Sequence, residues 1–203
     1  AETLASYFSD FQPQTRLNKL YIDAFPQEIL ASRESALLTR EALISALEEG
    51  TFMVDYLGHG NESQWAVENI LDATLVNDLT NRFYLPLFLT ATCEFGRYDD
   101  PSINTSGAEK LLLNENGGAI ALLTTTRPVY ASSNKLVNEA FHKNLFKTEN
   151  GSFLRLGDIM RLTKNESVSG VNNRNFSLLG DPMLQLQYPE NKIVIDSING
   201  FNI

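Results

Sequence analysis

The stretch LPLFLTATCEFG, residues 85–96, decides the fold, because an apolar run of strand length ends there in the chain's only cysteine, Cys93. The composition of residues 85–92 is typical of a strand buried on both faces of a sheet. A second run of this kind, TFMVDYL, occupies residues 51–57. A helical pattern at residues 70–79 lies between the two runs, so we expect the order strand, helix, strand.

The same alternation extends toward both ends of the chain. Helices are expected at residues 39–49, 106–113, 133–145 and 153–164, strands at 17–24 and 119–125, and a loop at 165–175. Thr39 and Ser133 are expected N-caps, and Ser106 with Glu109 has the spacing of a capping box. Parallel strands need crossover connections, which are usually helical. We therefore predict an α/β fold, a three-layer sandwich with a mainly parallel sheet.

Length and composition indicate one soluble globular domain. The chain has 203 residues, of which 43% are hydrophobic and 20% charged, enough for one packed core. We assign residues 1–189 to this domain and residues 190–203 to a final strand or the start of a following domain. Apolar residues recur at helical spacing almost from the first residue, so we expect the chain to be a piece of a longer protein.

Charge excludes one class of partner. The formal net charge is −9 and the pI about 4.7, so a nucleic-acid backbone would be repelled.

No apolar run approaches the roughly 20 residues of a membrane-spanning helix. A single cysteine allows no intrachain disulfide, and it leaves the redox compartment undetermined.

Two residues with complementary chemistry follow the two buried strands. His59 lies in the turn GHGN, residues 58–61, and Cys93 directly follows residue 92. A right-handed crossover makes the strands parallel neighbours, so both side chains are expected at the carboxyl edge of the sheet, where α/β proteins bind ligands. An imidazole beside a thiol removes its proton and later protonates a leaving amine. We predict Cys93 as nucleophile and His59 as general base, with the backbone N–H groups of Gly60 and Cys93 as an oxyanion hole.

Four strings in this order resemble the gingipain-type cysteine peptidase family. They are YLGHGNE (56–62) followed by Trp65, TATCEFG (90–96), GGAIALLTTTR (117–127) and FSLLGDP (176–182). The resemblance runs from about Leu17 to Tyr188. It implies a caspase-like fold and a Cys-His dyad at Cys93 and His59.

Within that family the strings are most similar to sortases of the type IX secretion system. This implies a protein at the outer-membrane surface of a Gram-negative bacterium, working with other secretion-system components. Its substrates would be the C-terminal sorting domains of secreted proteins, and a surface lipopolysaccharide would be the acceptor in a transpeptidation. The resemblance also implies another α/β subdomain ahead of this one, most of which we expect to lie outside these 203 residues. His59 and Cys93 lie 34 positions apart, fewer than the roughly 50 of caspases.

The sequence does not decide the roles of several residues expected near the dyad. The candidates for orienting His59 are Asp23, Glu62, Glu94 and Asp99. Trp65 either lines a substrate pocket or packs its loop against the sheet. Arg127 either shapes a pocket or pairs with a carboxylate.

No cofactor or metal is expected, although Asp99, Asp100 and Asn104 offer oxygen ligands for calcium. Asp-Asp-Pro is more typical of a turn. Asp181, in Gly-Asp-Pro, is assigned the same structural role. His142 falls on the polar side of its helix, so we expect it at the solvated surface.

Two alternatives to a peptidase remain. The chain could be a non-catalytic docking scaffold that keeps the fold, because free cysteines are often buried structural residues. It could also be an unrelated thiol hydrolase that acts on small amides or esters.

Overall fold

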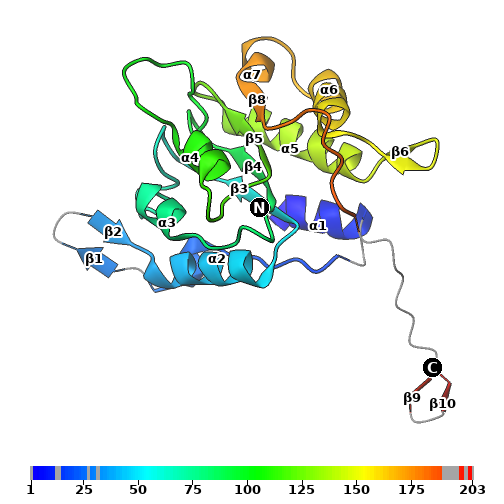
Figure 1. Ribbon diagram of the computed structural model, residues 1–203, viewed down its shortest axis with the longest axis horizontal. Helices are drawn as coiled ribbons and strands as arrows, with labels where there is room; N and C mark the ends of the chain where they lie inside the picture. The colour runs from blue at the N-terminus through cyan, green and yellow to red at the C-terminus, as the bar shows by residue number, and fades with distance from the viewer. Residues whose placement is uncertain are drawn as a thin grey trace.

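The structure, a computed structural model, describes residues 2–11, 15–26, 28–30, 33–188, 197–198 and 201–202. Its centre is a four-stranded sheet in the order β3 (Met53–Leu57), β4 (Leu87–Ala91), β5 (Ala121–Thr125) and β8 (Phe176–Leu179). The first three strands are parallel and β8 is antiparallel to β5. The predicted α/β fold with a mainly parallel sheet is confirmed (Figure 1).

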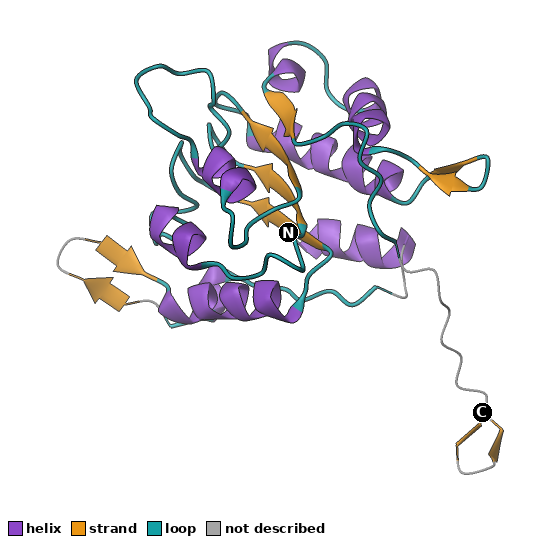
Figure 2. Cartoon of the chain, in the orientation of Figure 1, coloured by secondary structure: helices purple, strands orange, loops and turns teal. Residues whose placement is uncertain are grey.

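Helices cover both faces of this sheet (Figure 2). On one face lie α2 (Leu37–Glu49), α3 (Ala73–Asp78) and α4 (Gly107–Leu113), and on the other α5 (Ala131–Leu145) and α6 (Leu156–Glu166). Side chains alternate along each strand, so neighbouring residues enter different cores. The first core includes Leu47, Leu75, Phe88, Leu111 and Leu122; the second includes Leu87, Leu89, Leu123, Phe141 and Ile159.

Helix starts follow local capping chemistry in part. The predicted capping box is present at α4, where the Ser106 hydroxyl accepts from the Glu109 N–H and the Glu109 carboxylate accepts from the Ser106 N–H. The predicted caps Thr39 and Ser133 are wrong. Both α2 and α5 begin two residues earlier, so these hydroxyls lie inside the first turn, and the cap positions hold Ala36 and Tyr130 without a side-chain bond.

The strand expected at residues 17–24 is also wrong. Residues 16–21 have no regular structure and are followed by a short 3-10 helix, η1 (Ile22–Ala24). The side chains of Lys19 and Tyr21 bond instead to Glu2 in α1 (Glu2–Phe11), at 2.9 and 2.5 Å. A strand needs a partner, and among the described residues β3 pairs only with β4.

Smaller elements complete the described chain. Two hairpins pair β1 (Glu28–Leu30) with β2 (Arg33–Ser35) and β6 (Thr148–Glu149) with β7 (Ser152–Phe153). The loop expected at residues 165–175 is wrong in part, because α6 runs to Glu166 and α7 (Val171–Arg174) adds a helical turn.

At the carboxyl end only short elements are described. They are β9 (Ser197–Ile198) and β10 (Phe201–Asn202), which pair antiparallel. Most of the segment 190–203, expected to be a final strand or the start of a following domain, lies outside the described residues. None of the described helices has the length and apolar character needed to cross a bilayer.

Candidate active site

The strand register brings His59 and Cys93 to one edge of the sheet. In the parallel pair β3 and β4, Leu57 lies opposite Ala91. His59 and Cys93 each lie two positions beyond these strand ends, so the two turns start at the same level. Neighbouring strands are about 4.8 Å apart, which places the two turns side by side at the carboxyl edge.

The His59 turn is held through its backbone. The His59 carbonyl accepts from the Tyr56 hydroxyl at 2.6 Å and from the Ala66 N–H at 2.8 Å. Tyr56 stacks on Trp65 with ring centroids 4.2 Å apart, and burial raises the pKa of the Tyr56 hydroxyl well above its ordinary value. This phenol therefore stays protonated as a donor, and the ring of His59 is left exposed at the surface.

The Cys93 turn is tied to the next strand. The Thr125 hydroxyl donates to the Thr92 carbonyl, and the Gly96 N–H donates to the Thr125 carbonyl at 2.8 Å. Glu94, the residue after the cysteine, has a φ of +59°, in the left-handed region that few non-glycine residues adopt. This sharp turn interrupts the path of β4 at the point where Cys93 leaves the sheet.

The two turns also touch each other. A Cβ added to Gly60 would lie 2.6 Å from the Thr92 Oγ1 and 2.8 Å from the Gln64 carbonyl oxygen. Only a glycine fits this approach. The residue after the histidine is therefore packed against the residue before the cysteine.

The Cys93 thiol contacts a backbone carbonyl that follows β5. Cys93 is partly exposed, and its Sγ lies 3.9 Å from the Val129 carbonyl oxygen, at the far limit of a thiol hydrogen bond. Among the described contacts there is no hydrogen bond between this thiol and the His59 ring. Catalytic hydrogen bonds are often long or misaligned before a substrate binds, and this arrangement leaves the thiol weakly held.

Two backbone N–H groups in these turns have no acceptor among the described residues. Within the described part of the chain, neither the Gly60 N–H nor the Cys93 N–H donates a hydrogen bond. These are the two amides that the sequence indicates for an oxyanion hole. An unpaired N–H next to a nucleophile is available to a carbonyl oxygen of a ligand.

The candidate carboxylates have different surroundings. Glu62 and Glu94 both face the guanidinium of Arg97, at 3.4 and 2.7 Å. Asp99 pairs with Arg127 through two hydrogen bonds, at 2.8 and 2.7 Å, and these bonds lower the pKa of its carboxyl. Of the two roles considered for Arg127, the described contacts show the ion pair.

Arg97 was not among the residues that the sequence singled out. Its contacts follow from spacing, because Glu94 and Asp100 lie three positions to either side and Asp100 is 2.8 Å from the guanidinium. Two carboxylates placed three positions to either side of one basic residue are a visible sequence signal. Only the fold could add that Glu62, from the His59 turn, joins them.

The two aspartates considered for calcium, Asp99 and Asp100, have other partners. The Asp100 carboxylate accepts from the Ser102 N–H and hydroxyl, at 2.8 and 2.6 Å, and these bonds lower its pKa. This is the geometry of an Asp-initiated turn. No group of three metal-ligating side chains occurs among the described residues.

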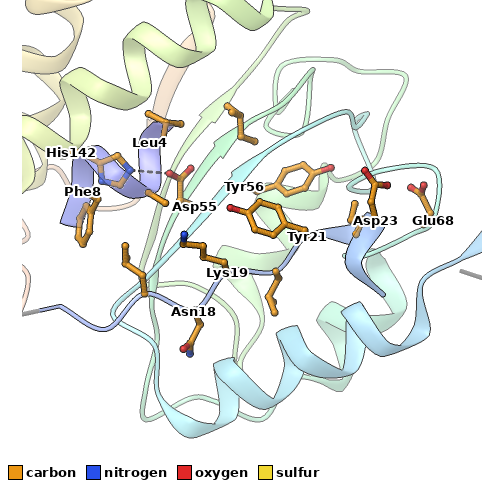
Figure 3. A pocket seen from close by; sticks show the side chains of 15 residues that line it. Leu4, Phe8, Asn18, Lys19, Tyr21, Asp23, Asp55, Tyr56, Glu68 and His142 are labelled. Atoms are coloured by element: carbon orange, nitrogen blue, oxygen red, sulfur yellow. Dashed lines mark hydrogen bonds and ion pairs between the residues drawn. The ribbon is translucent and has the colours of Figure 1, made fainter. Parts of the chain in front are cut away.

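A cavity of about 390 Å³ lies along the outer edge of β3, between this strand and residues 17–23 (Figure 3). Asp23 and Glu68 lie at one end of its lining in this view, and His142 with Phe8 at the other. Asp23 is thus near the end of β3 that leads to His59. Trp65 has 1% exposure and lines a neighbouring cavity, so it packs its loop and forms a cavity wall.

His142 is buried, which corrects the expectation of a surface position. Its exposure is 6%, and its Nε2 lies 2.9 Å from an Asp55 oxygen of β3, whose other oxygen accepts from Asn138 at 2.8 Å (Figure 3). Phe8 of α1 packs edge-on against the imidazole with centroids 5.0 Å apart. The helix periodicity shows one buried face, whereas α1 covers a second face of α5.

Known proteins resemble this chain in sequence and in fold. A sequence model of Peptidase family C25 matches residues 1–187. The crystal structure of the Arg-specific cysteine proteinase gingipain R (RgpB) superposes with a TM-score of 0.64 at 22% identity, over 73% of this chain and 36% of that one. A complex of the Porphyromonas gingivalis RgpB pro- and mature domains gives 0.60 at 22% identity, over 73% and 37%.

A third structure, described as a protease, gives a TM-score of 0.56 at 16% identity, over 70% of this chain and 37% of that one. At these identities the likeness shows the fold, which is the caspase-like arrangement of gingipains. The chain spans about a third of the length of these structures. None of the curated proteins compared with the chain matches it.

Proposed function

Because this chain belongs to peptidase family C25, we propose that it is a cysteine peptidase that breaks peptide bonds by acyl transfer to Cys93, with His59 as general base. The observation that carries the proposal is the parallel register of β3 and β4, in which both residues follow their strands at the same level. A thiol and an imidazole on adjacent turns are the minimum for this reaction.

The chemical steps use only these two side chains. His59 takes the Cys93 proton as the sulfur attacks the carbonyl carbon of the substrate, which forms the C–S bond. The C–N bond then breaks, and the proton passes from His59 to the leaving amine. Water or another amine attacks the thioester, gives its proton to His59, and the sulfur recovers it when the C–S bond breaks.

The tetrahedral intermediates carry a negative oxygen that needs donors. The Gly60 and Cys93 N–H groups have no acceptor within the described residues and start from adjacent turns. Preorganised donors of this kind contribute about 2.7–4 kcal/mol each where they have been removed in other enzymes. Their position supports an oxyanion hole for the acyl transfer proposed here.

The substrate class is proposed from the sequence strings. They resemble most closely PorU, the sortase of the type IX secretion system. We infer that the protein acts at the outer-membrane surface of a Gram-negative bacterium and removes C-terminal sorting domains from secreted proteins. Transfer of the thioester to an amine of a surface lipopolysaccharide is the transpeptidase form of this activity, and other secretion-system components are its partners. No cofactor takes part in these steps.

Active-site labelling tests the peptidase proposal. A peptidyl acyloxymethyl ketone should add once to the protein, on Cys93, with no adduct in Cys93→Ala and slower labelling in His59→Ala. The chain and a longer chain that includes a preceding α/β subdomain should both be measured by intact mass. Labelling that is equal with and without His59 would favour the docking scaffold, and turnover of small amides alone would favour a thiol hydrolase.

A further inference from the structure

Arg97 joins the two turns that carry the proposed dyad. Its guanidinium lies 3.4 Å from Glu62, three positions after His59, and 2.7 Å from Glu94, the residue after Cys93. A third carboxylate, Asp100, lies 2.8 Å away in the same loop. One side chain thus faces carboxylates from both turns.

These contacts are partly shielded from water. The Arg97 side chain is 30% exposed, and the carboxylate side chains of Glu62, Glu94 and Asp100 are 32%, 20% and 14% exposed. Exposed ion pairs contribute little, but a partly buried guanidinium with several carboxylates forms a network with fixed geometry. Without the guanidinium, three negative groups would face one another at the edge of the site.

The backbone supports the same junction. The first turn of α4 donates to both loops, from the Gly107 N–H to the Glu62 carbonyl at 2.7 Å and from the Ala108 N–H to the Phe95 carbonyl at 3.1 Å. The Arg97 N–H donates to the Glu94 carbonyl at 3.0 Å, which closes the turn around the left-handed residue. Arg97 therefore contributes a side-chain tie where the two loops already meet.

We propose that Arg97 is a positioning residue that holds the His59 turn against the Cys93 turn through Glu62 and Glu94. The inference rests on the proposed dyad and adds a residue outside it. Arg97 touches neither reacting group, and it acts by limiting how far the two turns can move apart. A displacement of about 1 Å between reacting groups costs up to about a hundredfold in rate.

A double-mutant cycle tests this role. The readout is the second-order rate constant for labelling of Cys93 by the peptidyl acyloxymethyl ketone, measured on the folded protein. Arg97→Met should lower it by about tenfold. In the His59→Ala background the same substitution should cause no further loss, because Arg97 acts through the position of His59. Arg97→Lys keeps the charge without the forked geometry and should recover part of the rate.

The controls separate positioning from general stability. Arg161→Met removes an exposed guanidinium paired within one helix and should leave labelling unchanged. If Arg97→Met does not fold, Glu62→Ala removes the acceptor in the His59 turn, leaves the Arg97 contacts with Glu94 and Asp100 in place, and carries the same cycle.

Three results would overturn the inference. If His59→Ala labels slowly and Arg97→Met labels at the normal rate, the role of Arg97 is refuted and the proposed dyad is not. Equal losses in both backgrounds assign Arg97 a purely structural role. Labelling that does not depend on His59 removes the dyad and the inference with it.

Discussion

Replacement of Gly60 by alanine tests the contact between the two turns most directly. The added Cβ would lie 2.6 Å from the Thr92 Oγ1 and 2.8 Å from the Gln64 carbonyl oxygen. Ordinary contacts begin near 3.4 Å, so the turn has to move by about 0.6–0.8 Å. Gly60 does not have a left-handed φ, and the penalty is therefore steric.

The hydrogen bonds around Gly60 limit how far the His59 turn can move to relieve this clash. The Gln64 carbonyl accepts from the Asn61 N–H at 3.0 Å, and the Ala66 N–H donates to the His59 carbonyl at 2.8 Å. Overpacking of this kind costs about 1–3 kcal/mol in unfolding free energy. A shift of His59 approaching 1 Å should lower the rate of Cys93 labelling by about 10- to 100-fold.

Two measurements separate the effects. Labelling rates report the site, and urea unfolding reports stability. Gly151→Ala, in the turn between β6 and β7, is the control, because Gly151 has a φ of +80° with no atom within 4 Å of an added Cβ. It should lose about 1–2 kcal/mol from left-handed strain and keep normal labelling. If the labelling rate constant of Gly60→Ala lies within twofold of that of the unchanged protein, the position of the His59 turn does not control the reactivity of Cys93, and the reasoning is refuted.

Substitutions at three further positions have defined outcomes. Thr92→Val removes a buried hydroxyl with no partner among the described residues, so the unfolding free energy should stay within about 1 kcal/mol by urea denaturation; a larger loss would reveal a missed hydrogen bond. Asp55→Ala leaves two buried donors unpaired, one of them on His142, and should cost about 2–4 kcal/mol, whereas Asp55→Asn should cost less; equal losses would contradict this. Asp72→Ala removes the N-cap of α3 and should cost about 1 kcal/mol at pH 7. Burial raises the pKa of the Asp72 carboxyl, but hydrogen bonds from Arg40 and from the first turn of α3 lower it by more, so the folded pKa lies below the ordinary value. The stabilisation by Asp72 is therefore fully present above the unfolded pKa of about 3.9, and it should be lost as the pH falls through the folded pKa.

Much of the fold could be predicted because its signals are local. Apolar runs of strand length, helical periodicity and the Ser106 capping box are each contained in a few neighbouring residues. Two failures had tertiary causes. Residues 17–24 have the composition of a strand, but among the described residues β3 pairs only with β4, so no strand of the sheet lies beside them. His142 is buried because α1 covers a second face of α5.

For the candidate site, the sequence predicted the topology. The order of strands and helices placed His59 and Cys93 at one sheet edge, and the register of β3 and β4 agrees with that placement. The direction of the thiol, toward the Val129 carbonyl, depends on a side-chain rotation that has no sequence signal. The contact of Arg97 with Glu62 joins residues 35 positions apart, which spacing within a turn cannot indicate.

The way in which the two turns are held determines how substitutions at the dyad can be interpreted. The His59 carbonyl is bound by the Tyr56 hydroxyl, and the Thr92 carbonyl by the Thr125 hydroxyl, so both turns are anchored through backbone atoms. The exposed ring of His59 and the partly exposed thiol of Cys93 contribute little to these anchors. Surface substitutions away from buried networks usually change stability by less than about 0.5 kcal/mol. A large loss of reactivity in His59→Ala with an unchanged unfolding transition would therefore measure the chemistry of the imidazole and not the fold that presents it.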